Sequence, residues 1–371
     1  MKKKIAYIIT LPILGGAQSH VYELMAHINE YDYETLLITG SAGWLTEKAD
    51  ELGIKCYIVP SIVREISPAN DIKALYDVCK ILKKEHPQII HCHSSKAGII
   101  GRIAGKMCGI NTVFTAHGWA FTEGISSKKR WLYCRIENFV GYFTDKIICV
   151  SEYDHQLGAN NLPAHKDKML TLHNAIPDLP QYVRDWETHS VGDVLHCVVV
   201  ARFSPPKKNV ELLHILRKLL DDGMSLDITF IGDGPDYAKA RAVTQVLGLE
   251  SSAFFLGARS DVPELLPQYD LLILLSNWEG LPISIIEAMR AGLPVLASDV
   301  GGVSEEVLHH ETGWLVQKGN EQDELVACLA DALQNKSIFQ EFGQNGRAIY
   351  QEKFNIKEMV NQIHSVYQEL Q

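Results

Sequence analysis

Two glutamates, Glu279 and Glu287, stand eight positions apart in the segment LLILLSNWEGLPISIIEAMRAG. The first follows an apolar run that predicts a buried strand, and the second falls inside a helical pattern. A carboxylate among apolar residues needs a hydroxyl or cationic partner to offset its lost hydration. A sugar ring would suit Glu279 and a ribose diol would suit Glu287. A solvated turn residue and an ordinary surface ion pair are the alternatives without a ligand.

The turn between these glutamates predicts a phosphate site. Pro282 suits the first position of a helix, where its missing N–H would be unpaired in any case. Free N–H groups and the positive end of the helix dipole attract phosphate oxygens. We therefore expect a phosphate group to contact the residues Gly280, Leu281, Pro282 and Ile283.

Basic residues follow another strand of the same half, in the segment VVVARFSPPKKN. Arg202, Lys207 and Lys208 could neutralise a diphosphate leaving group, and arginine can bind two oxygens at once. A solvated loop is the alternative. The glycine turns FIGDGP and SDVGGVSEEV could contact a ligand or serve only as tight turns, with Glu305 as an ordinary acid in a helix first turn.

Strand and helix patterns alternate along the whole chain and must position these residues. One series runs from KIAYIIT to KIICVSE, and a second runs from VLHCVVVAR to GWLV. This alternation predicts an α/β fold with two Rossmann-like parallel sheets, as the length of 371 residues also suggests. We expect domains at 1–175 and 193–354, a linker at 176–192, and a last helix at about 355–371 that packs back on the first domain. Ligands of such sheets lie at the carboxyl ends of the strands, which predicts a site in an interdomain cleft.

Composition narrows the class of protein. A formal net charge of −10 argues against nucleic acid as the main partner. The eight cysteines are scattered without a Cys-x-x-Cys pair, which favours reduced thiols in the cytoplasm over disulfides or zinc. The start MKKKIAYIITLPILGG could be a short signal peptide, but we interpret it as a buried strand. No apolar run reaches the length of a membrane-spanning helix.

On these residues the chain resembles the family 4 retaining glycosyltransferases, which have the GT-B architecture of two facing Rossmann-like domains. Glu279 and Glu287 are similar to the family's pair of glutamates, and AGLPVLASDVGGVSEEVLHHETGWLV continues its pattern. Arg202 and the lysine after it match the family's donor-diphosphate cations. Spacing from Arg202 favours Lys207, whereas the Lys-Asn pair that often marks this point falls on Lys208.

The amino-terminal half also resembles the family. Gly15 and Gly16 match its glycine turn, and their spacing lacks the G-x-G-x-x-G of a dinucleotide site. His117, in FTAHGWAF, matches the family's active-site histidine. His93, in QIIHCH, is a weaker candidate, with a packed core histidine as the alternative. Ala175 stands where the family usually has glycine.

The resemblance implies a function and a mechanism. The donor would be a nucleotide-diphosphate sugar, with a UDP-sugar favoured and a GDP-sugar next, bound by the second domain. The acceptor, on the side of the first domain, would be a saccharide or lipid-linked saccharide in cell-surface polysaccharide biosynthesis. Glu279 and His117 would hold the donor sugar and Glu287 the ribose. Arg202 and Lys207 would stabilise the departing diphosphate, so that no metal or other cofactor is expected. Attack on the front face would retain the anomeric configuration.

The segment 126–146 interleaves basic and aromatic residues, a combination suited to an anionic membrane surface. An amphipathic helix whose aromatic residues belong to the core is the alternative. We expect a cytoplasmic protein that contacts the inner face of the membrane peripherally. A GT-B nucleotide-sugar epimerase and a non-catalytic binding protein are the alternative functions, and the missing dinucleotide fingerprint disfavours an oxidoreductase.

Overall fold

The computed structural model describes residues 2–65, 67–122 and 124–371. The chain divides into two compact units. Unit 1 comprises Met1–Ala175 together with Ile356–Gln371, and unit 2 comprises Ile176–Asn355. Each unit contains one fully parallel sheet, which confirms the predicted fold class.

Unit 1 is built on a seven-stranded sheet in the order β3-β2-β1-β4-β5-β6-β7. Its inner strands, such as β1 and β4, are almost wholly buried, as expected for parallel strands that are covered on both faces, whereas the edge strand β3 is partly exposed. The KIAYIIT segment is β1, a central strand of this sheet. The strand bounds are β1 Lys3–Ile9, β2 Tyr33–Thr39, β3 Lys55–Ile58, β4 Ile89–His93, β5 Asn111–Ala116, β6 Lys146–Cys149 and β7 Met169–Thr171.

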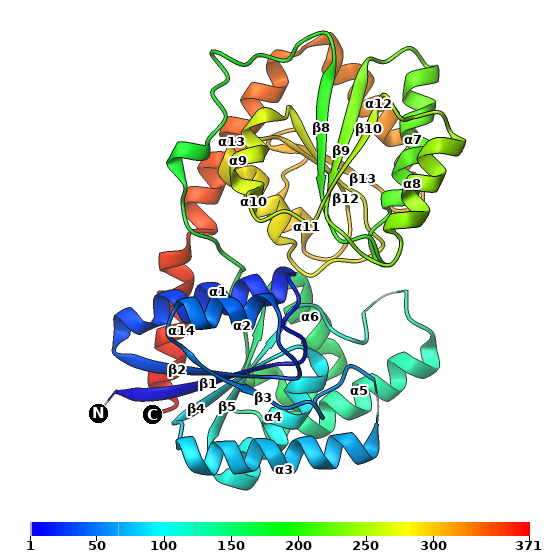
Figure 1. Cartoon of the computed structure of the whole chain (residues 1–371). Helices are drawn as coiled ribbons and strands as arrows, with labels where there is room; N and C mark the ends of the chain where they lie inside the picture. The colour runs from blue at the N-terminus through cyan, green and yellow to red at the C-terminus, as the bar shows by residue number, and fades with distance from the viewer. Residues whose placement is uncertain (1, 66, 123) are drawn as a thin grey trace. The chain divides into compact units, whose positions relative to one another are not determined.

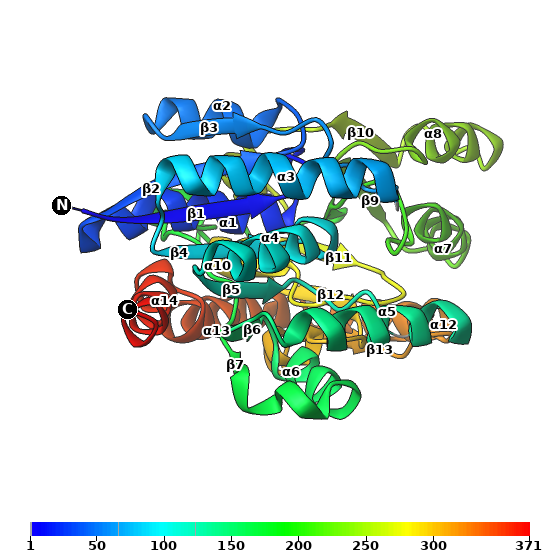
Figure 2. The same cartoon turned by 90° about the horizontal axis from the view of Figure 1, so that it is seen from below.

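Helices cover both faces of this sheet (Figure 1). Apolar residues of α1, α2 and α14 form the core on one face. Apolar residues of α3 and α4 form the core on the other, where these two helices lie side by side (Figure 2). The helix bounds are α1 Gly16–His27, α2 Trp44–Glu51, α3 Pro68–Glu85, α4 Ser95–Cys108, α5 Ser127–Gly141, α6 Glu152–Asn161 and α14 Ile356–Glu369, with short 3₁₀ turns at Ile28–Tyr31 and Pro163–Lys168.

The last helix, α14, completes the core of unit 1. Met359, Ile363 and Tyr367 are buried against residues of β1 and α1. The hydroxyl of Tyr367 also lies 2.6 Å from Nδ1 of the buried His91 on β4. The carboxyl-terminal segment is therefore part of the first folding unit, although the whole of unit 2 precedes it in the chain.

Unit 2 is built on a six-stranded sheet in the order β10-β9-β8-β11-β12-β13. Helix α7 packs against α8, and α10 packs against α13. The strand bounds are β8 Leu195–Val200, β9 Leu226–Ile231, β10 Ala253–Gly257, β11 Leu271–Leu274, β12 Val295–Ser298 and β13 Gly313–Val316. The helix bounds are α7 Asn209–Asp221, α8 Tyr237–Val246, α9 Val262–Leu265, α10 Ile283–Ala291, α11 Val303–Glu306, α12 Glu321–Gln334 and α13 Ser337–Lys353, with 3₁₀ turns at Pro180–Tyr182 and Leu266–Gln268.

The segment 176–192, expected as a linker, belongs to unit 2. Arg184 is almost fully buried and forms an ion pair of 2.6 Å with Asp270. The indole of Trp186 donates a hydrogen bond of 3.0 Å to the carbonyl of Gly292. These two buried anchors attach the segment to the second sheet and its helices.

Candidate active site

Glu279 follows β11 and lies in an ion pair with Lys207. Their Oε1 and Nζ atoms are 2.5 Å apart, and both side chains are largely buried, at 11% and 16% exposure. The hydroxyl of Ser276 donates a second hydrogen bond to the same oxygen of Glu279. Two donors therefore fix this carboxylate at the carboxyl end of the strand. Ser276 was not among the predicted site residues, although it lies only three positions before Glu279.

The neighbouring Lys208 faces a different partner. Its ammonium group pairs with Glu321, the first residue of α12. Its backbone N–H donates to the carbonyl of Leu275 at 2.9 Å, which holds the loop against the end of β11. The two lysines thus have different partners in the structure: Lys207 pairs with Glu279, and Lys208 pairs with Glu321.

Helix α10 begins at Ile283, one residue later than expected. Pro282 is its N-cap, with an extended ψ of 116°, and is not the first helical residue. The N–H of Ile285 already donates to the carbonyl of Pro282 at 3.0 Å. The first N–H groups of a helix lack acceptors within it, so the N–H groups of Ile283 and Ser284 are the ones suited to phosphate oxygens.

The second glycine loop packs directly on the Glu279 turn. Gly301 has a φ of +61°, and a Cβ at this position would lie 1.8 Å from the carbonyl oxygen of Glu279. The N–H of Gly302 donates to the carbonyl of Gly280 at 3.0 Å. Only glycine fits the position of residue 301, which explains the Gly-Gly pair in SDVGGVSEEV as a close backbone approach.

Glu306 is a buried carboxyl group near the same ion pair. Its exposure is 0%, and neither oxygen has a hydrogen-bond partner among the described residues. Burial raises the pKa of Glu306 well above its usual value, the Glu279 carboxylate raises it further, and Lys207 opposes this. Burial therefore favours the neutral, protonated form of this side chain. The sequence analysis considered the neighbouring Glu305 instead, as an acid in the first turn of a helix, and did not consider Glu306.

Glu287 lies on α10, where it is half-buried. Burial raises the pKa of its carboxyl group, and the charge of Arg290 partly opposes this rise. Hydrogen bonds from the hydroxyl groups of a ribose would offset the lost hydration of this carboxylate, and ribose binding is the role that the sequence predicts for Glu287.

Arg202 is exposed at the end of β8, where the FIGDGP loop approaches the backbone. A Cβ on Gly232 would lie 2.0 Å from the carbonyl oxygen of Ala201, and one on Gly234 would lie 2.5 Å from that of Phe203. These glycines thus allow close packing beside Arg202. These backbone contacts explain the glycines of FIGDGP as a tight turn, without a ligand. That was the alternative interpretation of this motif.

In unit 1, three histidines gather at the carboxyl ends of the central strands. His93 ends β4 and His117 follows β5, and their Nδ1 and Nε2 atoms lie 3.1 Å apart. His20, on α1, packs edge-on against His117 with ring centroids 4.9 Å apart. His20 and His93 are fully buried, whereas His117 is half-buried. The sequence predicted a role for His117 and a weaker one for His93, but gave no role to His20.

The predicted glycine turn begins α1, since Gly15 is its N-cap and Gly16 its first residue. Both are exposed. The φ of Gly15 is 176°, which is extended backbone, so the turn itself does not require glycine. The absence of a side chain leaves the helix start accessible to a ligand.

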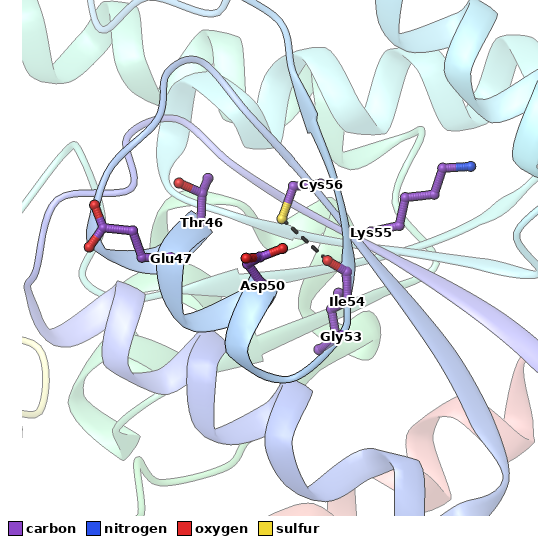
Figure 3. Close-up of a pocket in the computed structure, with 7 residues that line it drawn as sticks. All are labelled: Thr46, Glu47, Asp50, Gly53, Ile54, Lys55 and Cys56. Atoms are coloured by element: carbon purple, nitrogen blue, oxygen red, sulfur yellow. Dashed lines mark hydrogen bonds between the residues drawn. The ribbon is translucent and has the colours of Figure 1, made fainter.

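Figure 3 shows a hollow elsewhere on unit 1, between the end of α2 and the start of β3. It lies at the amino end of β3, opposite to the edge of the sheet that carries the histidines. None of the predicted site residues lines it; the lining residues are Thr46, Glu47, Asp50, Gly53, Ile54, Lys55 and Cys56. We therefore do not assign a role in catalysis to this hollow.

Comparison with known proteins extends along nearly the whole chain. Residues 14–178 match the family described as Glycosyltransferase Family 4. Residues 185–349 match the family described as Glycosyl transferases group 1. An Escherichia coli relative, UDP-Gal:alpha-D-GlcNAc-diphosphoundecaprenol alpha-1,3-galactosyltransferase, is 29% identical over 99% of this chain and 97% of its own length. N-acetyl-alpha-D-glucosaminyl L-malate synthase of Bacillus anthracis is 24% identical over 99% and 97%.

Solved structures share the fold. The structure of Anabaena HepE in complex with UDP and glucose matches with a TM-score of 0.82 and 21% identity, over 99% of both chains. Two parallel Rossmann-like units of this kind make up the GT-B fold. The chain belongs to glycosyltransferase family 4. No helix in the described part of the chain is long and apolar enough to cross a membrane.

Proposed function

We propose that this glycosyltransferase moves a sugar from a nucleotide-diphosphate donor to a saccharide or lipid-linked saccharide acceptor in cell-surface polysaccharide biosynthesis. The name of the Escherichia coli relative, which contains both UDP-Gal and a diphosphoundecaprenol acceptor, supports a UDP-sugar and a lipid-linked acceptor. The UDP complexes of HepE support the same nucleotide. A GDP-sugar is the next candidate.

The ion pair of Lys207 with Glu279 beside the start of α10 carries this proposal. Departure of the diphosphate leaves positive character on the anomeric carbon and negative charge on phosphate oxygens. Lys207, Arg202 and the first N–H groups of α10 would stabilise that negative charge. Glu279, held by two donors, would accept hydrogen bonds from donor-sugar hydroxyls, and Glu287 would accept them from the ribose.

Retention of the anomeric configuration completes the proposed mechanism. The bond between the anomeric carbon and the diphosphate oxygen breaks, and the acceptor oxygen bonds to the same face of the sugar. The acceptor proton passes to the departing phosphate oxygen, so that a nucleoside diphosphate leaves. His117 would orient the donor sugar near the acceptor. These protein cations make a divalent ion at the diphosphate unnecessary, and we propose that transfer is metal-independent.

Thermal stabilisation by nucleotides tests the donor site. We expect UDP to raise the melting temperature, since a ligand at 100 times its dissociation constant adds about 2.7 kcal/mol of stability. Replacing Glu287 by alanine should remove this shift, whereas replacing the exposed Glu341 on α13 should preserve it. A rise in melting temperature with GDP alone would indicate a GDP-sugar donor. No rise with any nucleotide, in folded protein, would contradict the proposal.

An acceptor-dependent assay tests the reaction class. Purified protein with UDP-galactose, UDP-glucose or UDP-N-acetylglucosamine and a lipid-diphosphate saccharide should release UDP and form an elongated glycolipid. Nuclear magnetic resonance of the product would then show whether the anomeric configuration of the donor is kept. Donor conversion without any acceptor would instead favour the epimerase alternative.

We also propose that α5 contacts an anionic membrane surface. Trp131, Phe139 and Tyr142 are exposed by 62%, 58% and 61%, which speaks against a purely core role for these aromatic residues. Lys128 and Lys129 are exposed near the start of the same helix. Aromatic side chains beside basic ones favour the interface between water and anionic lipids. A lipid-linked acceptor would lie at such an interface.

A further inference from the structure

The three clustered histidines of unit 1 converge on a small volume. One nitrogen from each of His20, His93 and His117 lies within 4.8 Å of the others. Nitrogens that bind one zinc ion tetrahedrally at 2.0–2.1 Å are roughly 3.4 Å apart. Ring movements of little more than 1 Å would therefore bring the three nitrogens to the spacing of metal ligands.

The buried nitrogens of this cluster have few ordinary partners. Nε2 of His93 makes no hydrogen bond to a described residue. The side chain of Asn174 lies beside the ring of His20 as a polar neighbour, although neither nitrogen of that ring makes a hydrogen bond of good geometry to a described residue. The nearby His91 shows the contrast. Its two nitrogens lie 2.6 Å from the Tyr367 hydroxyl and 2.7 Å from the Thr115 hydroxyl. His91 is thus a satisfied core residue, whereas Nε2 of His93 is a buried polar atom without a partner among the described residues, as expected of an atom that binds a ligand.

The protonation state of the cluster suits a cation. Burial lowers the pKa of His20 to about 4, and it lowers the pKa values of His93 and His117 well below their usual range, with neighbouring histidines adding to the effect. Neutral imidazole offers the lone pair that a metal needs. The proposal itself rests on the convergence of the three rings.

We propose that His20, His93 and His117 form a binding site for a divalent transition metal of the kind that imidazole prefers, with Zn²⁺ as the representative ion. Three protein nitrogens leave a fourth position for water or an exogenous ligand. His117 is half-buried and Gly118 beside it is exposed, so an ion can enter from that side. The ring of His91 packs against that of His93, with the ring centroids 4.2 Å apart.

The three histidines belong to unit 1, whereas the cations proposed for the leaving group belong to unit 2. His117 belongs to this site and also has a role in the proposed function. The following consequence rests on that proposed function. An ion that coordinates His117 removes this imidazole from its contact with the donor sugar. Metal binding should therefore inhibit transfer, while transfer itself proceeds without metal.

Direct binding measurements test the site independently of activity. We would titrate metal-free protein with Co²⁺ and follow the visible absorption of a histidine-bound ion, and then displace it with Zn²⁺. We expect one ion per chain. His20→Gln and His93→Gln should each weaken binding at least about tenfold, which corresponds to about 1.4 kcal/mol. His214→Gln, which changes an exposed histidine on α7, is the matched control.

The outcomes separate this inference from the proposed function. Stoichiometric binding that both variants weaken, in proteins with unchanged melting temperatures without metal, supports the site even if no transfer is found. Absent binding, or binding that the two variants leave unchanged, would overturn it and would indicate that ordered water satisfies the histidines. If His20→Gln does not fold, the His93→Gln variant decides. Inhibition by Zn²⁺ that is equal in wild type and His20→Gln would overturn the inhibitory consequence.

Discussion

Lys207 Nζ lies 2.5 Å from Glu279 Oε1, and this contact joins the loop after β8 to the turn after β11. A proposed phosphate cation and a proposed sugar-binding carboxylate thereby fix one another before any donor binds. Such preorganised charge costs no reorganisation during the reaction. The pair is accordingly the first target for mutation.

Replacing Lys207 by methionine should lower kcat by about 10²- to 10³-fold, the usual effect of losing one donor that stabilises transition-state charge. The change removes the charge and keeps most of the side-chain volume. Steady-state kinetics with a UDP-sugar would measure it. Lys208→Met is the matched comparison, because its ammonium group pairs with Glu321. An equal loss in both variants would contradict the distinct role of Lys207.

Replacing Gly301 by alanine should destabilise the protein by about 2–4 kcal/mol and weaken donor binding, because the new Cβ would collide with the carbonyl of Glu279. Gly319 is a matched control. It also has a positive φ, of +90°, but a Cβ there would have no neighbour within 4 Å. Gly319→Ala should cost only about 1 kcal/mol, from backbone strain alone. Urea denaturation of both variants would measure the difference, and equal costs would refute the collision.

Glu306→Gln should stabilise the protein at pH 8 and have little effect near pH 4. The folded-state pKa of Glu306 is raised above its usual value, so the folded state holds the proton longer than the unfolded state does. Wild-type stability therefore falls as the pH rises above the unfolded pKa, by 1.36 kcal/mol per pH unit until the folded pKa is reached. Glutamine cannot ionise and should lack this slope.

Urea denaturation across this pH range would measure the effect, with Glu341→Gln as an exposed control on α13. A gain of about 1–3 kcal/mol at pH 8 is expected, in the range of the penalty for a buried unsatisfied polar group. Parallel pH profiles for wild type and Glu306→Gln would show that the buried carboxyl group does not titrate as inferred.

Removing the charges of Lys128, Lys129 and Arg130 together by alanine should weaken binding to liposomes that contain anionic lipid. Each basic residue near such a surface contributes about 1 kcal/mol, so the loss should exceed tenfold. Liposome flotation at low and high salt would measure it. A triple variant of the exposed Lys239, Arg241 and Lys353 in unit 2 removes the same charge elsewhere. Unchanged binding after removal of the α5 charges would refute membrane contact by this helix.

The sheets could be predicted from the sequence because buried parallel strands are short apolar runs and their helices have a different period. The strands KIAYIIT and LLILLS illustrate this, since both are buried within their sheets. The place of 176–192 could not be predicted, because its polar composition conceals the buried partners of Arg184 and Trp186. Local composition does not record which distant groups satisfy a charge.

The candidate site was predictable only where residues are near in sequence. Glu279 and the start of α10 follow from one continuous motif, whereas the contact of Glu279 with Lys207 depends on the pairing of β11 with β8. His20, His93 and His117 come from a helix and two strand ends, and only the strand order of unit 1 brings them together. The burial of Glu306 likewise depends on the packing of a loop that the sequence presents as polar.

The position of α14 has a consequence for synthesis of the protein on the ribosome. Unit 2 emerges in full before Ile356–Glu369, the helix that supplies one side of the unit 1 core. The first 175 residues therefore cannot complete their core while the second unit is translated, and apolar surface of β1 and α1 stays uncovered. The second unit can already fold in this interval. At 5–20 residues per second, that interval lasts roughly 10 to 40 seconds. During that time we expect chaperones to bind the exposed apolar surface of the nascent amino-terminal half.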